Sequence, residues 1–213
     1  MPVSRLAAPV LGFVARRPPL SRMLFNAIFR SNKGPQGPSQ FLKKAIRAVK
    51  PGKALDVAMG QGRNAVLLTQ LGWDVTGFDI SEQAVAQTLE AARQCGVALH
   101  AVQSTSEAFD FGAERWDLIL LFYAWAPLSD PAFMRRLKGS LKSGGVVIFE
   151  HFLHDGSGAP PKAAGCPDLG ELPVLFAAFE SLRYEEVTAL PDWSPPLAGS
   201  RPRRLVRMIA RKP

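Results

Sequence analysis

Two carboxylates and a glycine turn in the first half of the chain are the residues whose types and spacing could do chemistry. Asp56 lies inside an apolar run, Gly60 and Gly62 follow it, and Asp79 ends a second short apolar run. Glycines let the backbone approach a ligand closely, and a carboxylate at a strand end can accept hydrogen bonds from two ribose hydroxyls. The pattern therefore predicts a nucleoside-binding half-unit of strand, glycine turn, helix and strand.

The glycine turn by itself leaves two kinds of nucleoside cofactor open. The run from Gly60 to Ala65 also fits the G-x-G-x-x-A pattern of dinucleotide-binding enzymes, so a nicotinamide oxidoreductase is one alternative. Two features disfavour it. Asp56 stands four residues before Gly60, where dinucleotide sites are usually apolar, and the unit begins only at residue 54, behind a helical extension.

Over residues 20–213 the sequence resembles the class I S-adenosylmethionine-dependent methyltransferases. The run from Asp56 to Gly62 is similar to their first motif, an acid followed by three alternating glycines, with Ala58 in place of the first glycine. Asp79 matches the acid that holds the ribose in that family. Residues 141–147 resemble the family's "LKPGG" turn into the fifth strand, with a serine replacing the proline. The phrases at 62–65 and 72–76 are similar to tellurite-resistance-type small-molecule methyltransferases.

The resemblance implies an S-adenosyl-L-methionine cofactor and an enzyme that transfers its methyl group to a small molecule by direct displacement. Relatives usually place an acid near the adenine amino group after the third strand. Here Ser106 or Glu107 could take that role, or residues 104–107 could be only a capped turn. The expected cofactor-binding residues are Asp56, Ala58, Met59, Gly60, Gly62, Asp79, Ile80, Ser106, Glu107 and Phe122.

Residues expected on the methyl-acceptor side follow the fourth and fifth strands, because ligands of an open α/β sheet bind at the carboxyl ends of its strands. Tyr123 and Trp125 are aromatic candidates for the pocket, and core packing is their alternative. His151 is a candidate general base, against a structural histidine or a metal ligand together with His154 and Asp155. Two further substrate candidates are Arg63, which could instead form a surface ion pair, and Phe29, which could close over the pocket together with Phe25.

Hydrophobic periodicity and capping residues predict the elements that must position these side chains. Helices are expected at 21–30, 41–49, 64–71, 82–95, 131–142 and 171–180. Strands are expected at 54–58, 74–79, 98–103, 118–122, 146–149, 182–189 and 204–210. Asn64, Ser81 and Asp130 are the expected helix caps.

The apolar strands between helices indicate an α/β fold, with a Rossmann-like, seven-stranded, mostly parallel sheet, helices on both faces and a C-terminal antiparallel hairpin. We expect a basic, weakly structured extension at 1–19, because its prolines break helices, and one domain at 20–213. Within that domain, N-terminal helices span 20–50, the cofactor-binding half spans 54–150, and the substrate-side half spans 151–213.

Positive charge gathers at the two ends of the chain. The net charge is +8, yet residues 1–53 carry eleven Lys or Arg and no acid, residues 201–213 carry six and no acid, and all eighteen acids lie between. The basic start could be a targeting peptide, a patch for anionic lipid or nucleic acid, or a solvated extension over the site. An RNA or protein methyltransferase that binds phosphate through these tails is therefore an alternative function, as is a non-catalytic S-adenosylmethionine-binding protein.

Composition sets the remaining expectations. Two cysteines, at 95 and 166, give no disulfide framework and fit a reducing, cytoplasmic compartment. No apolar run reaches the roughly 20 residues that a transmembrane helix needs. We expect a monomer or a dimer with a small-molecule methyl acceptor as its partner, and no bound metal.

Overall fold

The structure is a computed structural model that describes residues 14, 17–31, 37–154, 165–193 and 201–213. Asp155 and most of the extension expected at 1–19 therefore lie outside the described residues.

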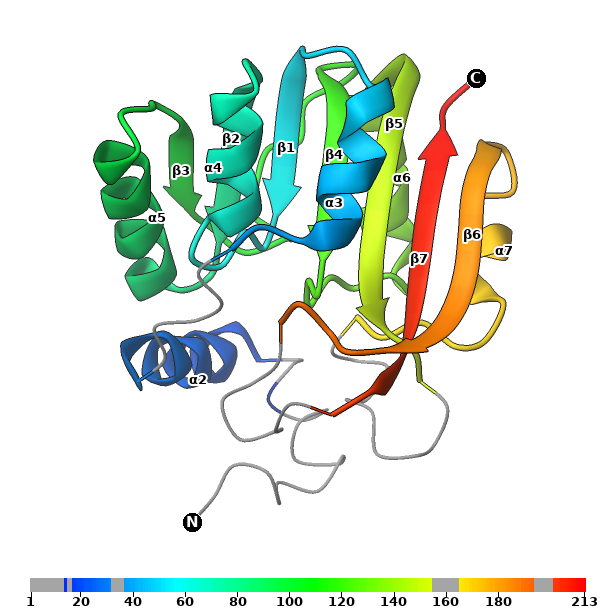
Figure 1. The fold of residues 1–213 in the computed structure, drawn as a ribbon. Coiled ribbons are helices and arrows are strands. Elements are labelled where there is room, and N and C mark those ends of the chain that lie inside the picture. Colours follow the sequence, from blue (N-terminus) through cyan, green and yellow to red (C-terminus); the bar gives the residue numbers. More distant parts are fainter. Residues whose placement is uncertain (1–13, 15–16, 32–36, 155–164, 194–200) are drawn as a thin grey trace.

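A seven-stranded sheet in the order β3-β2-β1-β4-β5-β7-β6 forms the centre of the molecule (Figure 1). Neighbouring strands from β3 to β5 run parallel, whereas β7 pairs antiparallel with both β5 and β6. The predicted fold class is confirmed. The strands are β1 (Lys53–Val57), β2 (Asp74–Asp79), β3 (His100–Gln103), β4 (Trp116–Phe122), β5 (Leu141–Phe152), β6 (Glu180–Ala189) and β7 (Arg203–Arg211).

Helices cover both faces of this sheet (Figure 1). On one face lie α3 (Gln40–Ala45), with the short 3₁₀ helix η2 (Ile46–Ala48), and α4 (Arg63–Gln70); on the other lie α6 (Pro131–Ser140) and α7 (Glu171–Leu175). The helix α5 (Glu82–Gln94) packs beside β2 and β3. The first long helix, α2 (Pro18–Ser31), lies apart from both layers, beneath the carboxyl ends of β1, β2 and β3.

Strand alternation decides which side chains reach which face. In β4, Leu118 and Leu120 pack under α3 and α4, whereas Ile119 and Leu121 pack under α6. Because side chains of a strand point alternately to opposite faces, the same rule separates Glu150 from His151 in β5.

Several predicted element ends are corrected by the structure. The largest difference is at β5, which begins at Leu141, inside the helix predicted at 131–142, and ends at Phe152 rather than at residue 149. The helix predicted from residue 21 begins at Pro18, because a proline is tolerated in the first turn, where its missing N–H has no partner to lose. Gly62, rather than Asn64, is the N-cap of α4, and the Asn64 side chain instead accepts a hydrogen bond from the Ser39 backbone N–H at 2.9 Å. The last helix is also shorter than predicted and ends at Leu175.

The other two predicted caps are confirmed. The Ser81 hydroxyl accepts a hydrogen bond from the Ala84 N–H at 3.1 Å at the start of α5. The Asp130 carboxylate accepts one from the Ala132 N–H at 2.9 Å, with Pro131 in the first turn of α6.

Candidate active site

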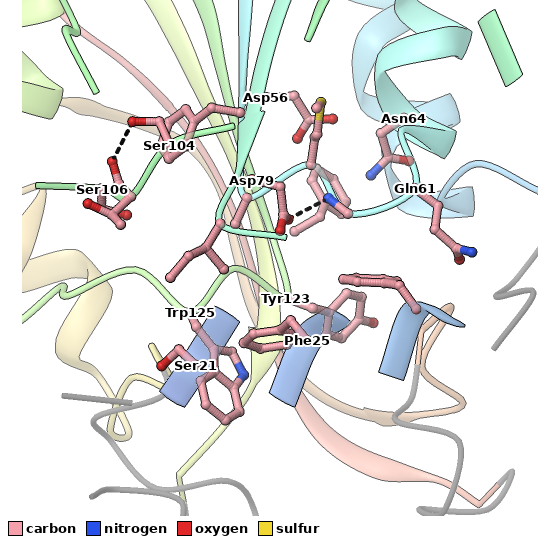
Figure 2. A pocket seen from close by; sticks show the side chains of 18 of the residues that line it. Ser21, Phe25, Asp56, Gln61, Asn64, Asp79, Ser104, Ser106, Tyr123 and Trp125 are labelled. Atoms are coloured by element: carbon pink, nitrogen blue, oxygen red, sulfur yellow. Dashed lines mark hydrogen bonds between the residues drawn. The ribbon is translucent and has the colours of Figure 1, made fainter. Parts of the chain in front are cut away.

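A pocket with about 1070 Å³ of empty space, part of it open to solvent, lies at the carboxyl ends of β1, β2 and β4 (Figure 2). Its walls come from the loops that follow these strands and β3, from the segment after β6 and from α2, whose Phe25 lies on the side opposite Asp56. The lining residues are Pro18, Ser21, Phe25, Phe29, Asp56, Ala58, Met59, Gly60, Gln61, Arg63, Asn64, Phe78, Asp79, Ile80, Ser104, Thr105, Ser106, Glu107, Phe122, Tyr123, Trp125 and Trp193.

The turn after β1 keeps three residues in the left-handed region of backbone space. Ala58, Gly60 and Gly62 have φ values of 53°, 57° and 73°. A Cβ on Gly62 would lie 2.4 Å from Cγ2 of Thr88 in α5, so only glycine fits between the turn and that helix. Ala58 adopts this conformation despite its side chain, at a cost of about 1–2 kcal/mol. The strain is concentrated where the backbone borders the pocket, as is common at ligand sites.

Asp56 brings an incompletely satisfied carboxylate to the base of the pocket. The residue is 2% exposed, and its Oδ2 finds no hydrogen-bond partner among the described residues. Burial raises the Asp56 pKa to about 7, assisted by the neighbouring Asp79 charge, although the Arg63 charge and the Ala65 N–H act in the opposite direction. A cationic or hydrogen-donating ligand group beside this carboxylate would relieve its desolvation.

Asp79 ends β2 and faces the same space (Figure 2). Its Oδ2 accepts the Gly60 N–H at 2.9 Å and its Oδ1 accepts the Ser81 N–H at 2.8 Å, which fix the carboxylate between the glycine turn and the start of α5. Burial raises its pKa to about 6, and the backbone N–H groups reduce that rise. Each oxygen keeps a lone pair with which it could accept a ligand hydroxyl.

The segment after β4 supplies the aromatic end of the pocket. Tyr123 is buried and has a φ of 53°, a strained conformation for a bulky residue. Its hydroxyl donates to Glu150 Oε1 at 2.7 Å, and its ring lies 5.8 Å from the Trp193 ring between centroids. Trp125 meets Phe25 of α2 edge to face at 4.8 Å. Figure 2 shows Trp125 and Phe25 closing the side of the pocket opposite Asp56.

Polar contacts hold α2 over the pocket. The Asn26 Oδ1 accepts the Ser81 hydroxyl at 2.6 Å, and its Nδ2 donates to Glu82 Oε1 at 3.2 Å. The Gln87 side chain donates to the Phe29 carbonyl at 3.0 Å. Phe29 itself packs 3.4 Å from the position that a Cβ on Gly60 would take. The covering helix is thus attached to α5, the helix whose cap also orients Asp79.

Thirteen of the fifteen predicted site residues line the pocket, and the other two, Gly62 and His151, do not. Those on the wall are Asp56, Ala58, Met59, Gly60, Asp79, Ile80, Ser106, Glu107, Phe122, Tyr123, Trp125, Arg63 and Phe29. Gly62 lies behind the turn against α5. Their location in the wall is observed, and their individual roles remain predictions.

His151 is not among the residues that line the pocket, although its ring centroid lies 6.0 Å from that of Tyr123 in the wall. It is 1% exposed, and its Nδ1 lies 3.3 Å from the Cys166 Sγ. Burial lowers its pKa to about 4, so the ring is neutral near neutral pH. Glu150, the preceding residue on the opposite face of β5, reaches the pocket only through the hydrogen bond that it accepts from the Tyr123 hydroxyl. The ligand set considered for a metal at His151 includes Asp155, which is outside the described residues.

Several residues of the wall were not predicted, and only some carried a local signal. Gln61 and Asn64 belong to the glycine motif, and Ser104 and Thr105 belong to the loop after β3, so strand ends could have indicated them. Trp193 carried no such signal. It reaches the pocket because the Asp192 carboxylate accepts hydrogen bonds from the Ser39 hydroxyl and the Gln40 N–H, both at 2.9 Å, at the start of α3.

Comparisons with known proteins agree with this geometry. Residues 54–145 match the family described as "Methyltransferase domain". The chain is 30% identical over 184 residues to "Hemagglutinin 1" of Eikenella corrodens, covering 81% of this chain and 58% of that protein. It is 45% identical over 42 residues to "Probable S-adenosyl-L-methionine-dependent methyltransferase TehB" of Haemophilus influenzae, covering 20% of this chain and 15% of that protein.

The fold is similar to the crystal structure of TehB from Haemophilus influenzae. The TM-score is 0.72 at 22% identity, over 83% of this chain and 63% of that chain. The chain thus spans less than two thirds of each of these relatives. Within the described ranges, no helix is long and apolar enough to cross a membrane, and no group of three His, Cys, Asp or Glu is arranged to hold a metal ion.

The pocket residues fit S-adenosyl-L-methionine. The glycine turn offers close backbone approach, Asp79 offers acceptors for ribose hydroxyls, and Asp56 offers an unpartnered buried oxygen to a cationic group. The sheet order, the domain match and these residues agree with one another: residues 54–145 match a methyltransferase domain, the fold is similar to that of TehB, and both findings support the resemblance to the class I S-adenosylmethionine-dependent methyltransferases.

Proposed function

We propose that this protein transfers the methyl group of S-adenosyl-L-methionine to a small-molecule acceptor. The observation that carries the proposal is the division of one pocket into two ends. The carboxylates of Asp56 and Asp79 and the glycine turn form one end, and the aromatic side chains of Phe25, Tyr123 and Trp125 form the other. This arrangement fits a nucleoside cofactor at the first end and an acceptor at the second.

The chain's own residues would hold the cofactor as follows. Asp79 would accept the ribose hydroxyls, since its carboxylate is already oriented by two backbone N–H groups. Asp56 would lie near the amino-acid part, where a positive charge would offset its burial. Ser106 or Glu107, in the wall beside Ile80, would lie near the adenine.

The acceptor end favours a small, largely apolar molecule. When bound, the cofactor supplies a methyl group already activated by sulfonium, so the protein must chiefly align the acceptor and exclude water. Such alignment can supply roughly 7–11 kcal/mol of the barrier reduction. Aromatic faces near a sulfonium add about 0.5–2 kcal/mol by cation–π attraction. The α2 cover and Trp193 narrow the space available to an acceptor.

Ion pairing argues against a macromolecular acceptor held by the basic C-terminal strand. Most of the positive charge of β7 is paired with the acidic residues of β6: Arg204 with Glu186, Arg207 with Glu185 and Arg211 with Glu180. Charges already paired within the protein gain less from releasing counterions of a nucleic acid. The small-molecule acceptor is therefore the function we carry forward.

Thermal unfolding with S-adenosylhomocysteine, with NAD in parallel, tests the proposal. Ligand at about 100 times its dissociation constant should stabilise the protein by about 2.7 kcal/mol, which is roughly 5–10 °C for a chain of this size. Asp79→Asn should remove most of the shift, while Asp74→Asn, at the exposed far end of β2, should keep it. A shift with NAD alone, or with neither ligand, would refute the cofactor assignment and with it the proposed reaction.

A further inference from the structure

A buried polar chain leads from the acceptor end of the pocket into the protein. Tyr123 lines the pocket, and its hydroxyl donates to Glu150 Oε1 at 2.7 Å. Glu150 has no exposed side-chain surface, and its other oxygen accepts Nε of Arg207 in β7 at 2.5 Å. The three residues come from the end of β4, from β5 and from β7, so the chain exists only in the folded sheet.

Two features distinguish this chain from a structural ion pair. Tyr123 is held in a left-handed conformation that bulky residues avoid, and such strain persists mainly where function requires the position. The carboxylate is also satisfied on both oxygens without contact with solvent, so its only link to the pocket is the tyrosine hydroxyl.

We propose that Tyr123 and Glu150 form a proton relay for the methyl acceptor, which therefore carries a protonated hydroxyl; the aromatic side chains of Phe25, Tyr123 and Trp125 at this end of the pocket suit a small planar ring beside that hydroxyl. The inference rests on the proposed function and deepens it. Tyr123 would contact the acceptor directly, whereas Glu150 is a positioning residue that acts through Tyr123. The Tyr123 oxygen, which donates its own proton to Glu150, keeps a lone pair for the acceptor hydroxyl.

The step balances without any further reactant. The acceptor oxygen forms a bond to the methyl carbon with its own electron pair, and the bond between that carbon and sulfur breaks, leaving its pair on sulfur. The acceptor proton passes to the Tyr123 oxygen while the Tyr123 proton passes to Glu150 Oε1. After the product leaves, Glu150 returns its proton to the Tyr123 oxygen, and the proton taken from the acceptor leaves that oxygen for water that enters the open pocket.

The surrounding charges suit a carboxylate that can hold a proton for a short time. Burial raises the Glu150 pKa, assisted by the Asp192 charge, while the hydrogen bonds from Tyr123 and Arg207 reduce that rise. Burial and the Glu150 charge hold the Tyr123 pKa well above its usual range, and the Arg63 charge opposes them. Arg207 is itself shared with Glu185 of β6 at 3.3 Å, which limits its hold on Glu150.

The chain provides a matched control, because it contains only two tyrosines and both donate to a glutamate. Tyr184 in β6 donates to Glu186 outside the pocket wall. We would compare the wild type, Tyr123→Phe, Glu150→Gln and Tyr184→Phe. Binding of S-adenosylhomocysteine is measured first by calorimetry. If the wild type does not bind it, the proposed function is refuted rather than the relay.

Phenol and anisole, which share a ring but differ in the hydroxyl proton, then serve as probes of the protein saturated with S-adenosylhomocysteine. The phenol hydroxyl can donate a hydrogen bond to the Tyr123 oxygen, whereas anisole has no proton to donate. We therefore expect phenol to bind the wild type and Tyr184→Phe roughly tenfold more tightly than anisole. Tyr123→Phe should reduce that ratio to near one, and Glu150→Gln should reduce it in part. Equal binding of the two probes to the wild type, no binding of either, or an unchanged ratio in Tyr123→Phe would overturn the relay.

A spectroscopic readout separates a relay from a purely structural hydrogen bond. In isotope-labelled Tyr184→Phe protein, Tyr123 is the only tyrosine signal, and its titration can be followed by NMR. Adding Glu150→Gln should lower the Tyr123 pKa, because it removes a nearby negative charge. An unchanged titration would overturn the coupling. If Glu150→Gln does not fold, the Tyr123→Phe probe comparison still decides the proposal.

Discussion

The Asp56→Asn substitution should change how the stability of the ligand-free protein depends on pH. Burial raises the Asp56 pKa in the folded protein to about 7, against 3.8 for an ordinary aspartate. Between these values the folded wild type keeps a proton on Asp56 that the unfolded chain has lost. Its free energy of unfolding therefore falls as pH rises through this window, whereas an asparagine at the same place does not ionise.

The magnitude follows from the size of the shift. Each unit of pKa difference corresponds to about 1.4 kcal/mol, so the shift of roughly three units is worth about 4 kcal/mol in total. Between about pH 5 and about pH 7, the free energy of unfolding of Asp56→Asn minus that of the wild type should grow by roughly 2–3 kcal/mol. At a fixed pH the asparagine could also lose about 1–3 kcal/mol if its buried amide lacks a partner. The slope with pH is therefore the informative quantity.

Urea unfolding of both proteins at a series of pH values measures this slope. Asp74→Asn, which removes an exposed carboxylate at the opposite end of β2, controls for the loss of one charge. We expect its difference from the wild type to stay nearly constant over the same range. A flat difference for Asp56→Asn as well would refute the claim that burial holds this carboxyl protonated in the empty pocket.

Three further substitutions test the positions described above. Gly62→Ala should destabilise the protein by roughly 1–3 kcal/mol more than Gly72→Ala, measured by chemical unfolding, because both glycines have positive φ but only Gly62 meets a neighbouring helix; equal losses would contradict the close approach. Asn26→Ala should speed proteolysis within α2 and cost about 1–3 kcal/mol, because it breaks the bonds to α5; unchanged cleavage would show that α2 is held by its aromatic contacts. Arg207→Met should cost about 3–5 kcal/mol near neutral pH by leaving Glu150 buried without its cation. Stability should recover as pH falls, since a protonated Glu150 needs no cation, and a loss independent of pH would argue against that cause.

Local signals were sufficient for most of the fold. The predicted bounds of β2 match the structure, because a short apolar run with a closing acid has few other interpretations. The caps Ser81 and Asp130 were predicted because a side-chain acceptor just before a helical pattern, followed at Asp130 by a proline, is a strong local signal. Asn64 was assigned wrongly as a cap, because the left-handed turn at Gly62 had already started the helix one residue earlier than the sequence suggests.

The pocket was less predictable where tertiary contacts decide. Periodicity predicts that Glu150 and His151 point to opposite faces of the sheet, yet it does not predict which of them hydrogen-bonds to Tyr123 in the pocket wall. That choice depends on the pairing of β5 with β7 and on the Arg207 that β7 provides. Trp193 could not be predicted at all, since it reaches the wall through an interaction between Asp192 and the distant start of α3.

The insertion of β7 between β5 and β6 has a consequence for the order in which the protein is made. The ribosome synthesises β6 before β7, yet β6 pairs only with β7 in the finished sheet. β6 therefore remains unpaired until β7 has been synthesised, and the edge of β5 that pairs with β7 remains unpaired for the same time. Unpaired strand edges invite association with other chains. Because Arg207 arrives on β7, the charge of Glu150 is compensated only in this last stage of folding, so a nascent chain cannot complete the aromatic end of its pocket before the sheet closes.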